Sequence, residues 1–71
     1  MTLSKISRGQ RVTIVSLKLT RSLEERLAAL GLFPGAEVEV VRSSRSGEAI
    51  LSCMDSRIAI GSDLSKRIEV V

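Results

Sequence analysis

The 71-residue sequence predicts a small, mainly β fold in which five to six short strands curl into a barrel, with one helix inserted between the first two strands. Short runs of alternating apolar and polar residues, rich in valine and isoleucine, recur between turn residues. One segment also carries both start and stop signals for a helix. Closing so small a sheet would leave few exposed strand edges.

Composition limits both the number of domains and the cellular setting. A chain of 71 residues, 44% of them hydrophobic, fits one domain spanning residues 1–71 and is too apolar to be disordered. Phe33 is the only aromatic residue, so the core must be aliphatic, and Cys53 has no second cysteine for a disulfide. No apolar run reaches the roughly 18 residues of a membrane helix, and the N-terminus is too polar for a signal peptide. These features predict a cytoplasmic protein.

The net charge of +3 comes from eleven basic and eight acidic residues that are interspersed along the chain. No block of like charges occurs, so we interpret the basic excess first as a solvated surface. Binding of nucleic acid is the weaker interpretation of the same charge.

Residues 11–17 predict the first strand, which follows a turn at residues 8–11. β-branched residues dominate this segment, as is typical of a half-buried strand. Both faces carry apolar residues, so we expect the helix or a partner to cover one of them. The alternation places Val12, Ile14 and Ser16 on one face, and Thr13, Val15 and Leu17 on the other.

Residues 22–31 predict the helix. Ser22 and Glu25 have the spacing of a capping box, in which each side chain binds the other residue's backbone N–H. Leu23, Leu27 and Leu30 follow at the spacing of a single apolar stripe. The helix should therefore begin at Ser22 and pack through its leucines.

The end of the helix and the next turn are also predicted. Gly31 stands where a left-handed C-terminal cap is needed, and Leu27 and Leu32 then occupy the paired hydrophobic positions of a Schellman stop. Pro34 and Gly35 fit the two central positions of a type II turn.

The rest of the chain predicts short strands at residues 37–41, 49–54, 58–60 and 66–71. A polar hairpin loop at 43–47 and a tight turn at 54–57 separate the middle strands. One helical turn at 61–65, capped by Ser62 or Asp63, precedes the last strand. The inward face of the 49–54 strand has two alternatives: Ile50, Ser52 and Met54, or Ala49, Leu51 and Cys53.

Residues 23–38 resemble the FeoA-type signature RL..LG..PG..V, which is met here by Arg26-Leu27, Leu30-Gly31, Pro34-Gly35 and Val38. The family's opening and closing elements are also resembled, by Leu3, Ile6, Gly9 and Ile14, and by Ile58-Ala59-Ile60 and Ile68-Glu69-Val70. Asp55 stands where the family usually has a turn glycine.

The resemblance implies an SH3-like barrel and a cytosolic accessory role in ferrous iron uptake. Its expected partner is FeoB, a GTPase-permease whose cytosolic part it would bind and modulate. Contact with the membrane would occur only through that partner, and weak homo-oligomer formation is compatible with such a module. The alternative is a basic SH3-like barrel that binds nucleic acid or acts as a metal-responsive regulatory module.

The residue inventory argues against catalysis and against a tight metal site. The chain has no histidine, so it lacks the usual general base near neutral pH and the usual activator for Cys53. Fe²⁺ sites favour histidine together with carboxylates. Glu24 and Glu25 diverge on the helix, whereas Glu37 and Glu39 share a strand face. We therefore expect neither enzyme activity nor a bound cofactor.

The predicted partner-binding face lies on the helix and its stop. An apolar stripe flanked by a basic residue is typical of a docking surface, although the same leucines would simply fill the core in the plainer interpretation. The residues assigned to this face are Leu23, Arg26, Leu27, Leu30 and Gly31.

Overall fold

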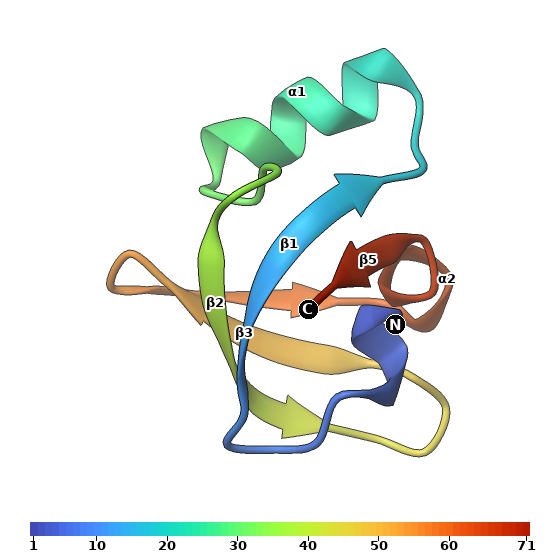
Figure 1. Ribbon diagram of the computed structural model, residues 1–71, viewed down its shortest axis with the longest axis vertical. Coiled ribbons are helices and arrows are strands. Elements are labelled where there is room, and N and C mark those ends of the chain that lie inside the picture. Colours follow the sequence, from blue (N-terminus) through green and yellow to red (C-terminus); the bar gives the residue numbers. More distant parts are fainter.

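The computed structural model describes residues 1–71, and its order of strands and α-helices matches the prediction, whereas the 3₁₀ turn at the start of the chain was not predicted. One helix lies between the first two strands and a helical turn precedes the last (Figure 1). The helices are η1 (Leu3–Lys5, a 3₁₀ turn), α1 (Arg21–Ala29) and α2 (Ser62–Ser65). The strands are β1 (Arg11–Leu17), β2 (Glu37–Ser43), β3 (Ala49–Cys53), β4 (Ser56–Ile60) and β5 (Ile68–Val70).

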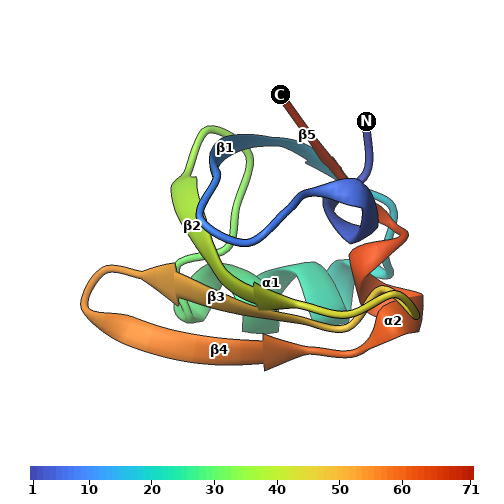
Figure 2. The same ribbon diagram turned by 90° about the horizontal axis from the view of Figure 1, so that it is seen from below.

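The five strands form one antiparallel sheet in the order β4-β3-β2-β1-β5. β1 pairs with β2 through its first residues and with β5 through its later ones, so the sheet turns about this strand. Figure 2 shows the result: β1 and β5 lie above β3 and β4, and β2 connects the two layers.

The prediction of a closed barrel is wrong, because β4 and β5 do not pair. The N-terminal residues occupy the edge of β5 that faces away from β1. Met1 accepts a 2.8 Å hydrogen bond from the Val70 N–H, and Thr2 forms a bridge with Glu69. The terminal ammonium of Met1 also lies 3.1 Å from a Glu69 carboxylate oxygen. With that edge already covered, the sheet stays open at β4.

The inward face of β1 differs from the alternation expected for a regular strand. The pairing with β5 shifts between Ile14 and Ser16, so one extra residue is accommodated on β1. Leu17 therefore shares the buried face with Ile14, whereas Val15 is 50% exposed. The prediction that grouped Ser16 with Ile14 is wrong for this reason.

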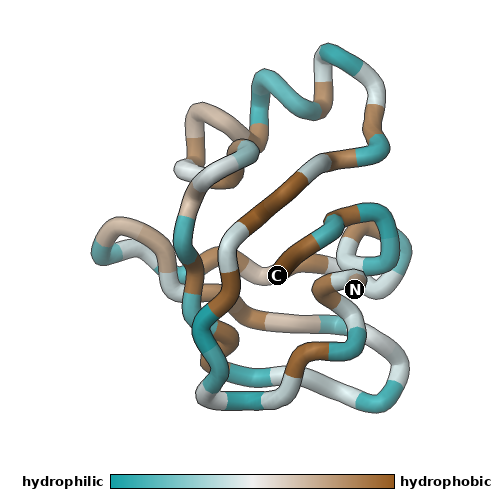
Figure 3. The backbone as a smooth tube through the Cα atoms, in the orientation of Figure 1, coloured by the Kyte–Doolittle hydropathy of each residue, from teal (hydrophilic) through white to brown (hydrophobic).

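A single cluster of sixteen buried residues forms the core between the two layers of the sheet. β3 contributes Ala49, Leu51 and Cys53, which decides between the two alternatives for its inward face. Figure 3 shows hydrophobic positions concentrated in the strands, whereas the β2–β3 connection is white to teal and has no strongly hydrophobic position.

The cap of α1 is Thr20, so the prediction of Ser22 is wrong. The Thr20 hydroxyl oxygen accepts a hydrogen bond from the Leu23 N–H at 3.3 Å, and its carbonyl accepts from the Glu24 N–H at 2.9 Å. Ser22 lies inside the first turn and is exposed. Both residues are hydroxyl-bearing, but Thr20 has the extended backbone that a cap requires.

The helical turn predicted before the last strand is present as α2, but its cap differs from the prediction. Gly61 has the extended backbone of the cap position and no side chain bonds across it, so neither Ser62 nor Asp63 serves as the cap. The buried residue here is Ser65, whose hydroxyl donates to the carbonyl oxygen of Gly47. This bond ties α2 to the β2–β3 connection.

Replacing the true cap should destabilise the protein, whereas replacing the nearby serine should not. We expect Thr20→Ala to lower the free energy of unfolding by about 0.5–2 kcal/mol, because one N-terminal donor of α1 loses its acceptor. Ser22→Ala is the matched control and should stay within about 0.5 kcal/mol of wild type. Urea denaturation of both variants provides the measurement, and a larger loss for Ser22→Ala would reverse the assignment.

Candidate partner-binding surface

The C-terminus of α1 is closed by a Schellman motif, as predicted. Gly31 has a φ of +98°, which glycine adopts more readily than any other residue. Its N–H donates to the carbonyl of Ala28 at 3.0 Å, and the Leu32 N–H donates to that of Leu27 at 2.9 Å. Leu27 and Leu32 are both buried, so the stop also anchors the helix end to the core.

The predicted type II turn follows at once. The Ala36 N–H donates to the Phe33 carbonyl at 3.0 Å, and Gly35 has a φ of +96°. Two further bonds fix the turn to β1: the Gly35 N–H donates to Ile14 at 2.7 Å, and the Ile14 N–H donates to Ala36 at 2.9 Å. Phe33 is left 41% exposed beside the end of the helix.

The hairpin between β3 and β4 presents a second apolar side chain to the same region. Its two central residues, Met54 and Asp55, have φ values of 49° and 68°, and Cys53 pairs with Ser56 across the turn. Two positive φ values are typical of a type I′ turn, which normally uses glycine or asparagine. Met54 is 80% exposed at this tip.

A groove of about 660 Å³ separates the end of α1 from the β3–β4 hairpin. We call it the hairpin groove. Its walls come from the last turn of the helix, the chain after Gly31, and both strands of the hairpin. The lining residues are Ala28, Ala29, Leu30, Gly31, Phe33, Cys53, Met54, Ser56, Arg57 and Ile58.

Exposed apolar side chains are concentrated around this groove. Leu30 is 52% exposed, and with Phe33 and Met54 it makes up half of the large hydrophobic side chains that the whole chain exposes. Ile58 adds a half-buried side chain to the lining. A contiguous apolar surface of this kind marks a binding site more often than single exposed residues do.

The hairpin groove contains only two of the five predicted site residues, Leu30 and Gly31. Arg26 is exposed on α1 outside the lining, and Leu23 is half-buried. Leu27 is 5% exposed and faces the core. The structure thus divides the predicted stripe between packing and surface.

Sequence reasoning missed Phe33, Met54 and Ile58 as members of the site. Phe33 is the only aromatic residue and follows a helix stop, which was an available signal. Met54 is an apolar residue at a hairpin tip, where polar residues and glycine are usual.

Gly31 and Cys53 are in close contact in the groove wall. The Cys53 thiol donates to the Gly31 carbonyl at 3.2 Å. A Cβ atom added at position 31 would lie 2.7 Å from the Cys53 Sγ, closer than packed atoms approach. A side chain at position 31 would therefore force Cys53 to shift, in addition to adopting an unfavourable φ.

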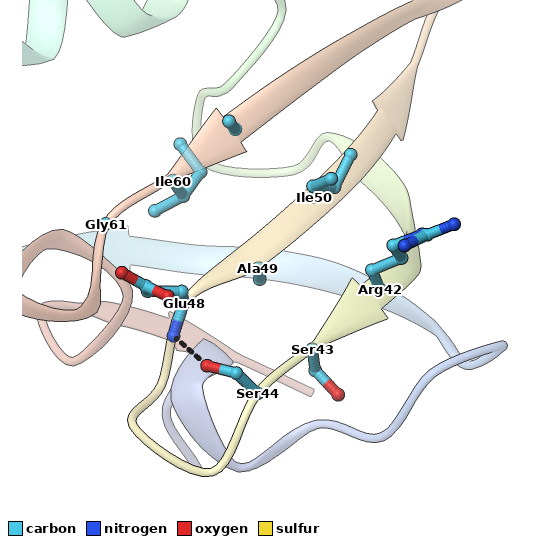
Figure 4. Close-up of a pocket in the computed structure, with 9 residues that line it drawn as sticks. Arg42, Ser43, Ser44, Glu48, Ala49, Ile50, Ile60 and Gly61 are labelled. Carbon is cyan, nitrogen blue, oxygen red and sulfur yellow. Dashed lines mark hydrogen bonds between the residues drawn. The ribbon is translucent and has the colours of Figure 1, made fainter.

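A second depression, of about 430 Å³, lies on the outer face of the sheet (Figure 4). Ile50 occupies its middle and pairs across strands with Ala59 and Arg42. The Glu48 N–H donates to the Ser44 hydroxyl at 3.2 Å beside it. The remaining lining residues are Ser43, Ala49, Ile60 and Gly61.

The acidic residues are scattered in space. No three of the histidine, cysteine, aspartate and glutamate side chains gather as a metal site would require. Glu37 and Glu39 lie on β2 opposite Thr13 and Arg11 of β1. Neither α-helix has the length and apolar character needed to cross a membrane.

Comparison with known proteins gives a consistent result. The family model described as "FeoA domain" matches residues 1–71. A crystal structure of an iron uptake regulatory protein (FeoA) is 31% identical with a TM-score of 0.87, covering 99% of this chain and 93% of that one. The solution structure of FeoA from Chlorobium tepidum is 27% identical with a TM-score of 0.86, covering 99% and 68%.

The iron(II) transport protein A of Clostridium thermocellum is also similar, with 28% identity and a TM-score of 0.84. The alignment covers 99% of this chain but 44% of that one. The search of curated proteins gave no match.

Two glycines with nearly equal φ allow the steric and conformational terms at Gly31 to be separated. Gly31→Ala should destabilise the protein by more than Gly35→Ala, because nothing lies within 4 Å of a Cβ at position 35. Each substitution places alanine at a strained φ, which lowers the free energy of unfolding by about 1–3 kcal/mol. Thermal melts of both variants measure the difference.

A Cys53→Ala background provides the control for this comparison. Removing Sγ should reduce the additional destabilisation caused by Gly31→Ala and leave the destabilisation caused by Gly35→Ala unchanged. Equal destabilisation by the two glycine substitutions in the wild-type background would contradict the contact.

Proposed function

The chain belongs to the FeoA domain family, and from this we propose that it is a cytoplasmic accessory protein of ferrous iron uptake that binds and modulates a FeoB-type GTPase-permease through protein contact. The observation that supports this proposal is the hairpin groove. It brings Leu30, Phe33 and Met54 together at the surface, next to backbone that two fixed turns hold in place.

The groups available to this surface suit binding better than reaction. Cys53 is buried, and its thiol is already engaged with the Gly31 carbonyl. The chain contains no histidine that could activate it. Apolar side chains in a concave surface, by contrast, supply the desolvated centre of a typical protein interface.

Arg57, in the lining of the groove, and Arg26, one helical turn before Leu30 on α1, favour an acidic rim on the partner. Arg26 on α1 and Arg57 on β4 are both exposed, and neither forms an ion pair. Opposite charges at an interface rim mainly accelerate association and select the partner. We therefore assign an apolar centre and a basic border to the docking surface.

The predicted residues take different parts in this proposal. Leu30 and Arg26 would contact the partner directly, and the exposed edge of Leu23 would extend the contact along α1. Leu27 and Gly31 are buried, so they would hold the helix end in position.

Modulation requires that the module bind one state of the transporter more tightly than another. A ligand with equal affinity for two conformations changes neither population. On this proposal the protein acts by biasing the conformation of its partner.

Removing an apolar contact from the groove should weaken binding to the cytosolic part of the transporter. We expect Leu30→Ser to lower the affinity by roughly tenfold, as a moderate interface contact would. Val15→Ser is the matched control, because Val15 is 50% exposed and Leu30 52%, but Val15 lies on β1 away from the groove. Calorimetric titration measures both, and equal affinities would contradict the assignment of the groove.

Reversing the charge of Arg26 tests the border separately. Arg26→Glu should slow association, and the effect should shrink as salt is raised from low to physiological concentration. Surface plasmon resonance at two salt concentrations gives the rates, after a melt confirms folding. Unchanged association at low salt would remove Arg26 from the surface.

A further inference from the structure

The two edges of the sheet differ in whether another segment of the chain pairs with them. Met1 and Thr2 cover the outer edge of β5 with backbone contacts. β4 pairs with β3 on one side only, and no other segment pairs with its other side. One edge of the sheet is therefore open.

The pairing pattern identifies the backbone groups at this edge. The two-residue turn makes Cys53 and Ser56 a hydrogen-bonded pair, and such pairs alternate along an antiparallel ladder. Arg57 and Ala59 therefore lie at the non-hydrogen-bonded positions of this ladder. Their N–H and C=O groups point away from β3. No turn or loop hydrogen bond reaches either residue.

β4 has only one of the features that usually protect a sheet edge, the charged side chain of Arg57. The five residues of β4 pair with β3 in continuous register, without a bulge and without proline. Protected edges usually carry such interruptions or several charges. Arg57 is the only charged residue in the strand.

We propose that β4 binds an extended segment of the partner as an additional strand, through the backbone groups of Arg57 and Ala59. This inference rests on the proposed function and specifies how the same partner docks. Strand addition of this kind draws affinity from main-chain hydrogen bonds and specificity from alternate side chains.

The surroundings of β4 define the chemistry of that segment. On one face, Ser56 and Ile58 lead into the hairpin groove, which suits apolar side chains. On the other, Ala59 borders the depression around Ile50 shown in Figure 4. The unpaired guanidinium of Arg57 favours a carboxylate beside it. The occupant is thus an extended segment with apolar residues on one face and an acidic residue on the other.

A second copy of the chain fits this edge less well. In the central registers of an antiparallel β4–β4 pair, the two Arg57 side chains would lie opposite or diagonal to each other on one face. Like charges in that position are destabilising. The partner segment avoids this repulsion.

Amide hydrogen exchange tests the backbone contact directly. On adding the cytosolic part of the transporter, we expect exchange at the Arg57 and Ala59 amides, followed by NMR, to slow by about tenfold or more. Ile58 and Ile60 are internal references, because their amides already face β3. If adding the partner slows exchange more at Arg57 and Ala59 than at Ile58 and Ile60, the result supports strand addition.

Three outcomes would overturn the inference. Binding with unchanged exchange at Arg57 and Ala59 would do so while leaving the proposed function intact. Absence of binding would overturn both proposals. Protection without the transporter that rises with protein concentration, together with a dimer mass, would assign the edge to a second copy.

Proline at the edge gives an independent test. Ala59→Pro removes an outward N–H without breaking a bond to β3, and edge strands tolerate such a residue. We expect it to lower the affinity by roughly tenfold, whereas Ala59→Ser, which keeps the N–H, should stay within about twofold. A folded Ala59→Pro variant with wild-type affinity would contradict the proposal, and the exchange experiment on the wild type decides the matter if that variant fails to fold.

Discussion

The left-handed backbone at Gly31 is the constraint on which the rest of this surface depends. It ends α1, turns the chain so that Leu32 is completely buried, and starts the turn that bonds to β1. The same residue packs against the Cys53 thiol of β3. One backbone reversal thus fixes the end of the helix relative to the β3–β4 hairpin.

Elements governed by local chemistry could be predicted from the sequence. The bounds of β1, the stop at Gly31 and the turn at Gly35 follow from residue type and spacing alone. The start of α1 could not be fixed, because Thr20 and Ser22 are both plausible caps and only the backbone conformation separates them. The inward position of Leu17 and the open sheet depend on a register shift and on the N-terminal pairing, which are non-local.

The candidate surface was predictable only in part, for a related reason. Leu30 and Gly31 belong to a helix whose amphipathic pattern is visible in sequence, but Met54 reaches the same groove from a separate hairpin. Only the three-dimensional packing brings the two together. The predicted leucine stripe is split between core and surface. The nine-residue helix rests on a small core and buries Leu27 alone.

At Met54, backbone strain is not offset by burial of the side chain. A φ of 49° in a residue with a side chain costs about 1–3 kcal/mol relative to a residue suited to it, and the turn type favours glycine or asparagine. The side chain is 80% exposed, so packing within the chain does not offset that cost. Neither the backbone nor the core therefore accounts for methionine here. An apolar, flexible side chain held at the rim of an apolar groove is accounted for if a partner buries it, since methionine adapts readily to the shape of a binding surface.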